Sequence, residues 1–459
     1  MALPLRAQVL YGTSRVGIEA IGKSQALWLV YYYAPPKDAD LPTLVPSLAV
    51  GALLLVAGII GALDEAIVGY FSDRTRSRWG RRIPYIVAGA PLWGVFFVLL
   101  FTPPADAGAA VTAVYLFFVF SAVAFFGAVA SAPYEALLPE IVPSSAGRVS
   151  LQAIKVFLGV AGAAAGLVGS DFLVDHLGFK AMALSIAALG VVCQYLGIGG
   201  VWGRAKLSRT PADLSFREAL RATFRNVPFR ILLPTVVLFA LAFQLLSIDI
   251  PFYVHAVVGR HSWLTPRVLL TVAIAAAILC VPLFIRLAQR SSKRRAYRLS
   301  MLAAAVSFPL LGFAGLVPGI PASAQILVAT ALIGGPIGAH FLFPVPLTAD
   351  VIDHDSGRTN LRREATYLGA ASFVERTATS VAPLILVLLR FLGDTRGHTL
   401  GVRLAGPVGG VIIFGAYLLF RSYDVPDEVR DRLEPEAATA AELIERPPSV
   451  LAPENEPAS

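Results

Sequence analysis

The stretch that decides the fold is Gly69-Tyr-Phe-Ser-Asp73-Arg74-Thr-Arg76-Ser-Arg78-Trp79-Gly80-Arg81-Arg82. An uncharged run at residues 46–63 precedes it, and a second apolar run at residues 83–101 follows it. Two apolar runs joined by a short basic loop are typical of a transmembrane hairpin, and Lys and Arg accumulate on the cytoplasmic side of a membrane. The stretch therefore predicts two membrane spans joined by a cytoplasmic loop.

The composition of the whole chain is that of a membrane protein. Of its 459 residues, 56% are hydrophobic and 15% are charged, whereas a soluble protein is roughly one quarter charged. The net charge of +8 is compatible with a nucleic-acid partner, but the arginines sit in short loops between apolar runs, which favours a role in membrane orientation. We expect no nucleic-acid partner. The two cysteines, Cys193 and Cys280, fall inside apolar runs, so no disulfide framework is indicated.

Apolar runs recur along the chain and predict twelve membrane spans. They cover approximately residues 12–34, 46–72, 83–103, 108–138, 149–174, 179–203, 229–258, 264–288, 298–318, 322–350, 365–392 and 402–421. Basic residues gather in alternate connections, at residues 74–82, 204–230, 290–298 and 358–363 and at Arg148 and Arg421. This alternation predicts a multi-pass protein of the cell (inner) membrane with both termini in the cytoplasm. We expect a monomer.

Two related halves are indicated by the layout of the motifs. Pro133-Tyr-Glu-Ala136 and Pro346-Leu-Thr-Ala349 each lead into a polar loop that ends in arginine, and repeated halves are typical of alternating-access transporters. The long middle connection contains a basic amphipathic stretch at residues 216–224, which we expect to lie along the membrane surface. The predicted organisation is a six-helix bundle at 1–203, a linker at 204–228, a second bundle at 229–421 and a mobile acidic tail at 422–459.

Acidic side chains inside the spans are the first functional candidates, because a charge at that depth is costly. Asp64 and Glu65 precede Asp73 by eight or nine residues, which places them roughly 12 Å into a hydrocarbon core about 30 Å thick. They are interpreted as a cation or proton site, or alternatively as a structural pair with a base on another span. Glu19 is interpreted as an acceptor for sugar hydroxyls, or alternatively as the ion-pair partner of basic residues four positions away in the same span.

Other ionisable residues in the spans complete the set. Lys155 is expected to pair with one of these acids or to donate to a substrate hydroxyl, and Arg376 to be the counter-ion of the first-half carboxylates. Glu135 lies near the cytoplasmic end of its span, so gating or structural pairing is favoured over binding. Asp249 is expected to be wet at the outer end of its span, and His340 to pack between helices rather than to relay protons.

Three motifs resemble those of the glycoside–pentoside–hexuronide:cation symporters, a branch of the major facilitator superfamily typified by melibiose permease. They are residues 69–82 followed by Ile83-Pro84-Tyr85, the segment Pro133-Tyr-Glu-Ala-Leu-Leu-Pro139-Glu140, and Ala349-Asp350-Val-Ile-Asp353-His-Asp355 with Arg362-Arg363-Glu364-Ala-Thr-Tyr367. The likeness covers almost the whole membrane part. It implies an all-α membrane protein of the major facilitator fold, with twelve helices in two six-helix halves.

The resemblance also implies roles for single residues. Glu19 stands where melibiose permease has a sugar-binding aspartate, Lys155 where it has a sugar-contacting arginine, and Arg376 where it has a lysine linking the sugar and cation sites. Phe341 replaces an aromatic residue near the sugar. The second sugar-binding aspartate corresponds to Ser131, and a nearby tryptophan to Glu135. The resemblance therefore does not imply a specificity for galactosides.

The sodium site of the family is altered in this chain. Its two aspartates correspond to Gly61 and Glu65, its asparagine to Asp64 and its threonine to Ala128. Two oxygen ligands are thus missing. Sodium needs a shell of several oxygens, whereas a proton needs one carboxylate in a suitable environment. The departures favour proton coupling over sodium coupling, or no coupling at all.

The sequence therefore predicts a secondary transporter that imports a sugar, glycoside or related polar solute with a cation, and no cofactor or metal. A lysolipid or amphiphile carrier and an uncoupled facilitator are the alternatives, and a membrane sensor is a third. An enzyme is disfavoured, because no phosphate-binding loop, metal-spaced cluster or nucleophile elbow is present. The substrate site is assigned to Glu19, Ser131, Lys155, Phe341, Ser372 and Arg376, and the cation or proton site to Asp64 and Glu65. The cytoplasmic gate is assigned to Asp73, Arg74, Arg81, Arg82, Glu135, Asp350, Asp353, Arg362, Arg363 and Glu364.

Overall fold

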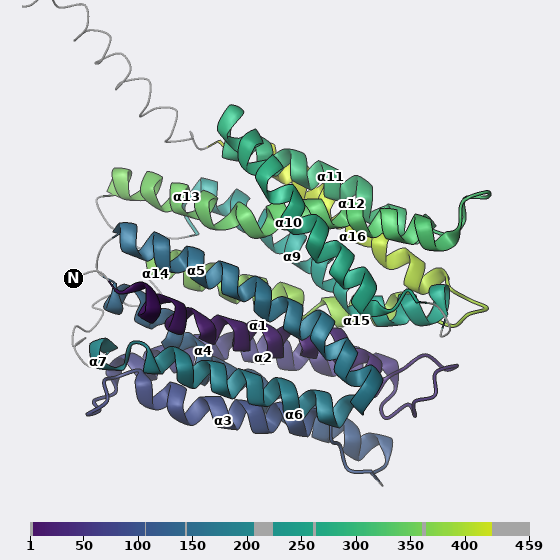
Figure 1. Cartoon of the computed structure of the whole chain (residues 1–459), viewed down its shortest axis with the longest axis horizontal. Helices are drawn as coiled ribbons and strands as arrows, with labels where there is room; N and C mark the ends of the chain where they lie inside the picture. Colours follow the sequence, from purple (N-terminus) through teal and green to yellow (C-terminus); the bar gives the residue numbers. More distant parts are fainter. Residues whose placement is uncertain are drawn as a thin grey trace, which may run out of the picture.

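The computed structural model is helical throughout, apart from one isolated bridge between Thr395 and His398 in the part of the chain that it describes (Figure 1). It describes residues 3–105, 107–142, 145–205, 224–259, 263–359 and 364–424. The predicted amphipathic stretch, apart from Phe224, and the predicted tail beyond residue 424 lie outside these ranges. The bounds of the four predicted regions stay predictions.

The first half is built from long helices that follow the predicted spans. They are α1 (Leu5–Tyr33), α2 (Ser47–Arg74), α3 (Ile83–Leu100), α4 (Ala109–Ile141), α5 (Ser145–Ala164), the π-helical turn η1 (Ala165–Gly169), α6 (Ser170–Gly199) and the short α7 (Trp202–Ala205). The predicted fifth and sixth spans are separated at Gly178, where the backbone leaves the helical conformation. Its φ of 80° lies in the left-handed region that glycine adopts without steric cost.

The second half contains two spans that are broken by proline. Its elements are α9 (Val227–Tyr253), η2 (Val254–Val258), α10 (Pro266–Arg290), α11 (Lys293–Phe313), α12 (Ala322–Leu342), α13 (Pro344–Thr359), α14 (Glu364–Thr379), α15 (Ala382–Arg390) and α16 (Leu400–Phe420). The predicted span 322–350 breaks before Pro344, and the predicted span 365–392 breaks just before Pro383 in the first turn of α15. A proline is tolerated in the first turn of a helix but disrupts a helix interior, so each break falls where the sequence allows it.

The lengths and hydropathy of the helices confirm an all-α, multi-pass membrane protein. In the described residues, ten helical stretches are long and apolar enough to cross a membrane. One of them has 49 residues; at 1.5 Å per residue it is about 74 Å long, enough for two crossings of a core about 30 Å thick. Helix α1 is not among the ten, and it carries Arg15, Glu19 and Lys23. The count of twelve stays a prediction.

The helices run roughly parallel in two groups, with the purple and blue helices below the green ones in Figure 1. Helix α1 packs against α5 and α6, and α3 against α4 and α6; in the second half α16 packs against α9 and α11, and α10 against α12. Small residues let backbones approach closely in a membrane. A β-carbon at Gly162 of α5 would lie 2.4 Å from the Val16 carbonyl of α1, so this contact depends on glycine.

The two halves are in close contact at one end. We call it the outer end and define it by Asp38, His255 and Arg390; the inner end carries the basic loop 74–82. Helix α2 runs along α14 and α15 from the outer end to mid-depth. A β-carbon at Gly51 would lie 3.1 Å from the Leu384 backbone, and one at Gly58 would lie 2.4 Å from Ser380 Cβ.

Polar contacts also join the halves at the outer end. Asp38 accepts from His255 Nε2 at 3.0 Å and from the Arg396 backbone N–H at 3.3 Å, and Arg390 donates to the Ala34 carbonyl at 2.8 Å. Burial works to raise the pKa of Asp38, but the hydrogen bonds from His255 and Arg396 outweigh it and hold that pKa below its ordinary value. The structure is therefore closed at its outer end.

Replacing Gly58 by valine is expected to open this end. Overpacking costs about 1–3 kcal/mol, and 1.4 kcal/mol corresponds to a tenfold shift in an equilibrium. A cysteine at the buried Val387 of α15 should therefore react about tenfold faster with a polar maleimide in purified Gly58→Val. Gly69→Val is the control, because Gly69 lies on the same helix with nothing within 4 Å. Unchanged reactivity in Gly58→Val would contradict the close contact.

Candidate functional site

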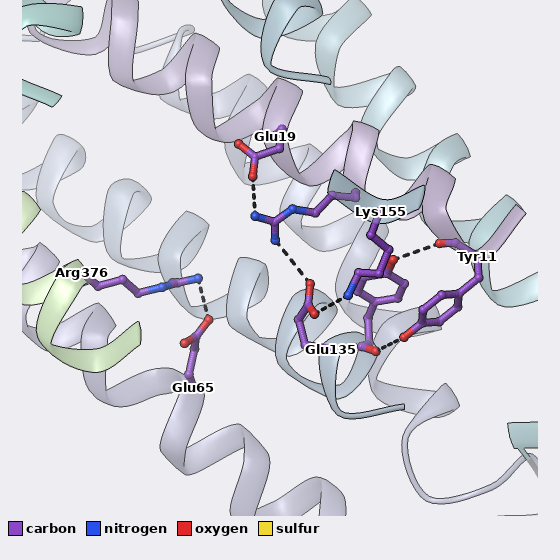
Figure 2. A network of polar contacts seen from close by, with 8 residues as sticks. Tyr11, Glu19, Glu65, Glu135, Lys155 and Arg376 are labelled. Atoms are coloured by element: carbon purple, nitrogen blue, oxygen red, sulfur yellow. Dashed lines mark hydrogen bonds and ion pairs between the residues drawn. The ribbon is translucent and has the colours of Figure 1, made fainter. Parts of the chain in front are cut away.

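A chain of ion pairs crosses the middle of the first half (Figure 2). Arg15 NH2 lies 2.6 Å from Glu19 Oε1 on α1, and Arg15 NH1 lies 3.3 Å from Glu135 Oε1 on α4. The other oxygen of Glu135 lies 2.5 Å from Lys155 Nζ on α5. Glu19 is also 3.9 Å from Lys23 Nζ. Both readings of Glu19 thus remain open, because its ion pairs leave part of the carboxylate to accept a hydroxyl.

Lys155 is buried beside Glu135, with its ammonium group over two tyrosine rings. Its ammonium is 4.9 Å from the Tyr134 ring centroid and 5.8 Å from that of Tyr11, and only 2% of the residue is exposed. Tyr11 donates to the Tyr134 carbonyl at 2.5 Å, and Tyr134 donates to the Tyr11 carbonyl at 3.0 Å, which fixes α1 against α4 (Figure 2). The predicted pairing of Lys155 with an acid is thus present, and its contact with a substrate hydroxyl stays a prediction.

A second ion pair joins the halves at mid-depth. Arg376 NH2 of α14 lies 2.5 Å from Glu65 Oε1 of α2 (Figure 2). The predicted pairing of Arg376 with a first-half carboxylate is thus present. Asp64 is 9% exposed, close enough to Arg376 and Glu65 to feel their charges, and has no ion pair in the described part of the chain. One turn earlier, a β-carbon at Gly61 would lie 2.9 Å from Ala124 Cβ, so a longer side chain there would require α4 to shift.

Glu375 belongs to the same group, although its place in the sequence indicated only a carboxylate that neutralises a neighbouring charge. It is exposed on α14, and the charges of Lys23, Arg376, Arg15 and Glu19 act on it. Three of these four groups come from α1 in the other half. The only sequence signal for Glu375 is a carboxylate in mid-span beside Arg376, and that signal does not distinguish a lining residue from a simple counter-ion.

The exposure of these charged groups points to a space that water can reach. The side chains of Glu135 and Arg376 are 43% and 45% exposed, although both lie inside membrane-spanning helices. A charge facing hydrocarbon costs several kcal/mol, and such side chains face a bundle interior or a water-filled cavity. Because Arg376 also bridges to Glu65 in the other half, we place this water-accessible space between the halves, on the inner side of the outer-end contacts.

The remaining predicted substrate residues come from several helices. Phe341 of α12 is exposed and meets Phe243 of α9 edge-on, with ring centroids 5.7 Å apart, and Lys23 Nζ lies 5.5 Å from the centroid of Phe243. Ser372 is exposed one turn before Arg376 on α14, whereas Ser131 of α4 is buried. Their binding roles stay predictions. His340 is a packing residue, as predicted: it stacks on Phe239 at 4.1 Å and meets the Tyr297 hydroxyl at 3.2 Å.

The predicted gate is described only in part. Asp350 Oδ2 lies 2.6 Å from Lys293 Nζ within the second half. Arg74, Arg81, Arg82 and Asp353 each take part in interactions. Arg362 and Arg363 and the side chains of Asp73 and Glu364 lie outside the described residues. The gating role of this set stays a prediction.

Known proteins resemble this chain in sequence. A family model described as MFS/sugar transport protein matches residues 10–395. The inner membrane symporter YicJ of Escherichia coli (strain K12) is 26% identical over 234 residues, which is 50% of this chain and 49% of that protein. The isoprimeverose transporter of Lactiplantibacillus pentosus is 24% identical over 356 residues, or 75% of this chain and 72% of that protein.

Solved structures share the fold. The nucleoside transporter NupG aligns with a TM-score of 0.61 at 13% identity, covering 92% of this chain and all of that one. A bacterial homologue of the human drug peptide transporters PepT1 and PepT2 aligns with a TM-score of 0.62 at 13% identity, covering 95% of this chain and 98% of that one. At these identities the likeness establishes the arrangement of the helices alone.

Proposed function

Because the chain belongs to the family of MFS/sugar transport proteins, which are membrane transporters rather than enzymes, we propose that it carries a sugar, glycoside or related polar solute across a membrane. The observation that carries the proposal is a group of charged side chains from both halves that are exposed inside membrane-spanning helices, Glu135 from the first half and Glu375 and Arg376 from the second. Sugar hydroxyls both donate and accept hydrogen bonds, and charged groups make stronger hydrogen bonds than neutral ones. Glu19, Glu375 and Arg376 are the groups assigned to hold the solute.

The places where the halves touch support alternating access. The outer end is closed by backbone contacts and hydrogen bonds, whereas the charged space lies below them, between α1 and α14. Transporters with repeated halves bind the solute near mid-depth and rock one half against the other. In this account the Arg376–Glu65 pair is the pivot contact, because it joins the halves beside the solute.

Proton coupling is proposed from the charges that line the space. They comprise five carboxylates, Glu19, Asp64, Glu65, Glu135 and Glu375, and four bases, Arg15, Lys23, Lys155 and Arg376. One bound proton makes this set neutral. Asp64 is the proposed acceptor, because it is the most buried of the five acids and has no ion pair among the described residues. Sodium is disfavoured, because Gly61 and Ala128 offer no side-chain oxygen.

Counterflow in proteoliposomes tests the proposal. Purified protein is reconstituted, loaded with one unlabelled sugar at a time, and assayed for exchange of the labelled sugar at several pH values, with and without Na⁺. We expect exchange of at least one sugar or glycoside and accumulation driven by an inward proton gradient. Flux that ignores both pH and Na⁺ would contradict the coupling, and thermal stabilisation by lysolipids but by no sugar would contradict the solute class.

Asp64→Asn is expected to separate sugar accumulation driven by a proton gradient from sugar counterflow. The variant has no titrating group at this position, so sugar accumulation driven by a proton gradient should fall at least about tenfold, the effect of 1.4 kcal/mol, while counterflow continues. Asp424→Asn, at an exposed acid whose ion pair with Arg294 stays within the second half, is the control and should accumulate sugar normally. Equal loss of accumulation and counterflow in Asp64→Asn would assign Asp64 to the solute instead.

A further inference from the structure

Asp249 is a buried acid that the transport proposal does not use. It lies on α9, four residues before the end of that helix at the outer end, and is 1% exposed. The expectation that it is wet is therefore wrong, because the end of α1 packs over this part of α9: Tyr31 meets Phe252 edge-on at 5.1 Å. Its Oδ1 has no hydrogen-bond partner in the described part of the chain.

The base next to this acid is already occupied. Arg390 of α15 acts on Asp249 through its charge. Its Nε and NH2 donate to Asp394 Oδ2 at 2.9 and 2.6 Å, its NH1 donates to the Ala34 carbonyl of the other half, and its guanidinium carbon lies 4.0 Å from the Phe252 ring centroid. A carboxylate buried without a hydrogen bond is costly and takes up a proton instead.

We propose that Asp249 is a proton-binding site that controls the outer end. With the proton bound, Asp249 is neutral and does not draw Arg390 away from the Ala34 carbonyl. Arg390 then keeps that hydrogen bond to the other half, and the halves stay closed. When the halves part, Ala34 withdraws, water reaches the carboxyl, the O–H bond breaks to release one proton to the outer side, and the carboxylate pairs with Arg390. The inference rests on alternating access but not on any particular solute or coupling ion.

Other titratable groups on the neighbouring elements could also make the opening of the outer end depend on pH, so their effects must be distinguished from that of Asp249. Those at the same end are Tyr31 of α1, Tyr253 of α9, His255 of η2, Arg390 of α15 and Arg403 of α16. Helices α12, α13 and α14 contribute His340, Asp350 and Arg376, which lie at mid-depth or nearer the inner end. Across the interface, Asp171 accepts from the Arg267 backbone N–H at 3.2 Å. Protonation of His255 would also favour closure through Asp38, so His255 and Asp171 need their own controls.

The test measures the opening of the outer end in purified full-length protein, without solute. Cys193 and Cys280 are replaced by serine, and Val387→Cys reports opening through its reaction with a polar maleimide between pH 5.5 and 8. Leu392→Cys, exposed at the same end, corrects for the pH dependence of the thiol itself. We expect corrected labelling to rise with pH, by up to about tenfold per pH unit, the limit for one linked proton.

Variants at Asp249 and at two control positions test whether Asp249 is the group that binds the proton. Asp249→Asn, which stays neutral, should label slowly at every pH, and Asp249→Glu should restore the rise. Asp171→Asn and His255→Gln should keep it. A flat wild-type profile, a rise that persists in Asp249→Asn, or a rise abolished by either control variant would overturn the inference. Should Asp249→Asn not accumulate in the membrane, the wild-type profile and the two control variants decide. Failure of sugar transport leaves these results unaffected.

Discussion

Arg376→Gln is expected to lower sugar uptake about a hundredfold while leaving the protein folded in the membrane. Two losses combine in this variant. A hydrogen bond to a charged group contributes about 1.5–3 kcal/mol, so removing the guanidinium weakens solute binding, and Glu65 loses the partner that lies 2.5 Å away. A combined loss of about 2.7 kcal/mol corresponds to a hundredfold. Initial rates of labelled-sugar uptake in proteoliposomes measure the effect.

Two companion variants separate the charge of Arg376 from its shape. Arg376→Lys keeps the positive charge and should recover part of the uptake. The double variant Glu65→Gln with Arg376→Gln removes both charges, so it should regain thermal stability without regaining uptake. If Arg376→Gln transports at the wild-type rate, Arg376 neither contacts the solute nor joins the halves during the cycle.

Glu135→Ala is expected to give the largest loss of stability, about 3 kcal/mol or more. Lys155 is 2% exposed, and its ammonium lies 2.5 Å from Glu135 Oε2. Removing one partner of a buried ion pair leaves an uncompensated charge, at a cost of about 3–5 kcal/mol. Since Arg15 loses a partner as well, uptake should fall with stability. Thermal unfolding of the purified protein in detergent measures this loss.

The matched control for Glu135→Ala removes the stranded charge. Lys155→Met together with Glu135→Ala should recover most of the unfolding temperature, because methionine can cover the rings of Tyr11 and Tyr134 without a charge. An unfolding temperature of Glu135→Ala equal to that of the wild type would show that Lys155 is solvated. The double variant is not expected to transport, since its lining lacks the carboxylate between Arg15 and Lys155.

Hydropathy was enough to predict an all-α, multi-pass membrane protein, because a bilayer permits few backbone arrangements. The hairpin around residues 69–82 illustrates this: α2 ends at Arg74 and α3 begins at Ile83. The break at Gly178 falls between the predicted fifth and sixth spans. Breaks inside a predicted span were not predictable in the same way: the runs that contain Pro344 and Pro383 break beside those residues, whereas Pro91 lies inside α3. Proline and glycine permit a break, and tertiary packing decides whether one occurs.

The residue types of the candidate site were predictable, and so was the pairing of Arg376 with a carboxylate of the first half, but not which carboxylate it meets. A charged residue in the middle of an apolar span is easily recognised in the sequence, so Glu19, Glu65 and Arg376 were identified as candidates. Which base each acid meets depends on contacts between helices far apart in sequence, as in the pair Glu65–Arg376. The prediction that Asp249 is wet was wrong for the same reason. Its position near the end of its span suggested contact with water, but the end of α1 packs there and excludes that water.

The most direct test of the central claim is the accessibility of Ser372, which is exposed on the same face of α14 as Arg376. Ser372→Cys is made in a background without Cys193 and Cys280, reconstituted, and exposed to a membrane-impermeant maleimide from either side. Val411→Cys, on an exposed face of α16, is the control. We predict that Ser372→Cys reacts from the side of the basic loop 74–82, that transported sugar slows this reaction, and that Val411→Cys reacts only with a lipid-soluble reagent. Reaction of Ser372→Cys with the lipid-soluble reagent alone, unaffected by any sugar, would contradict a shared water-filled space between the halves.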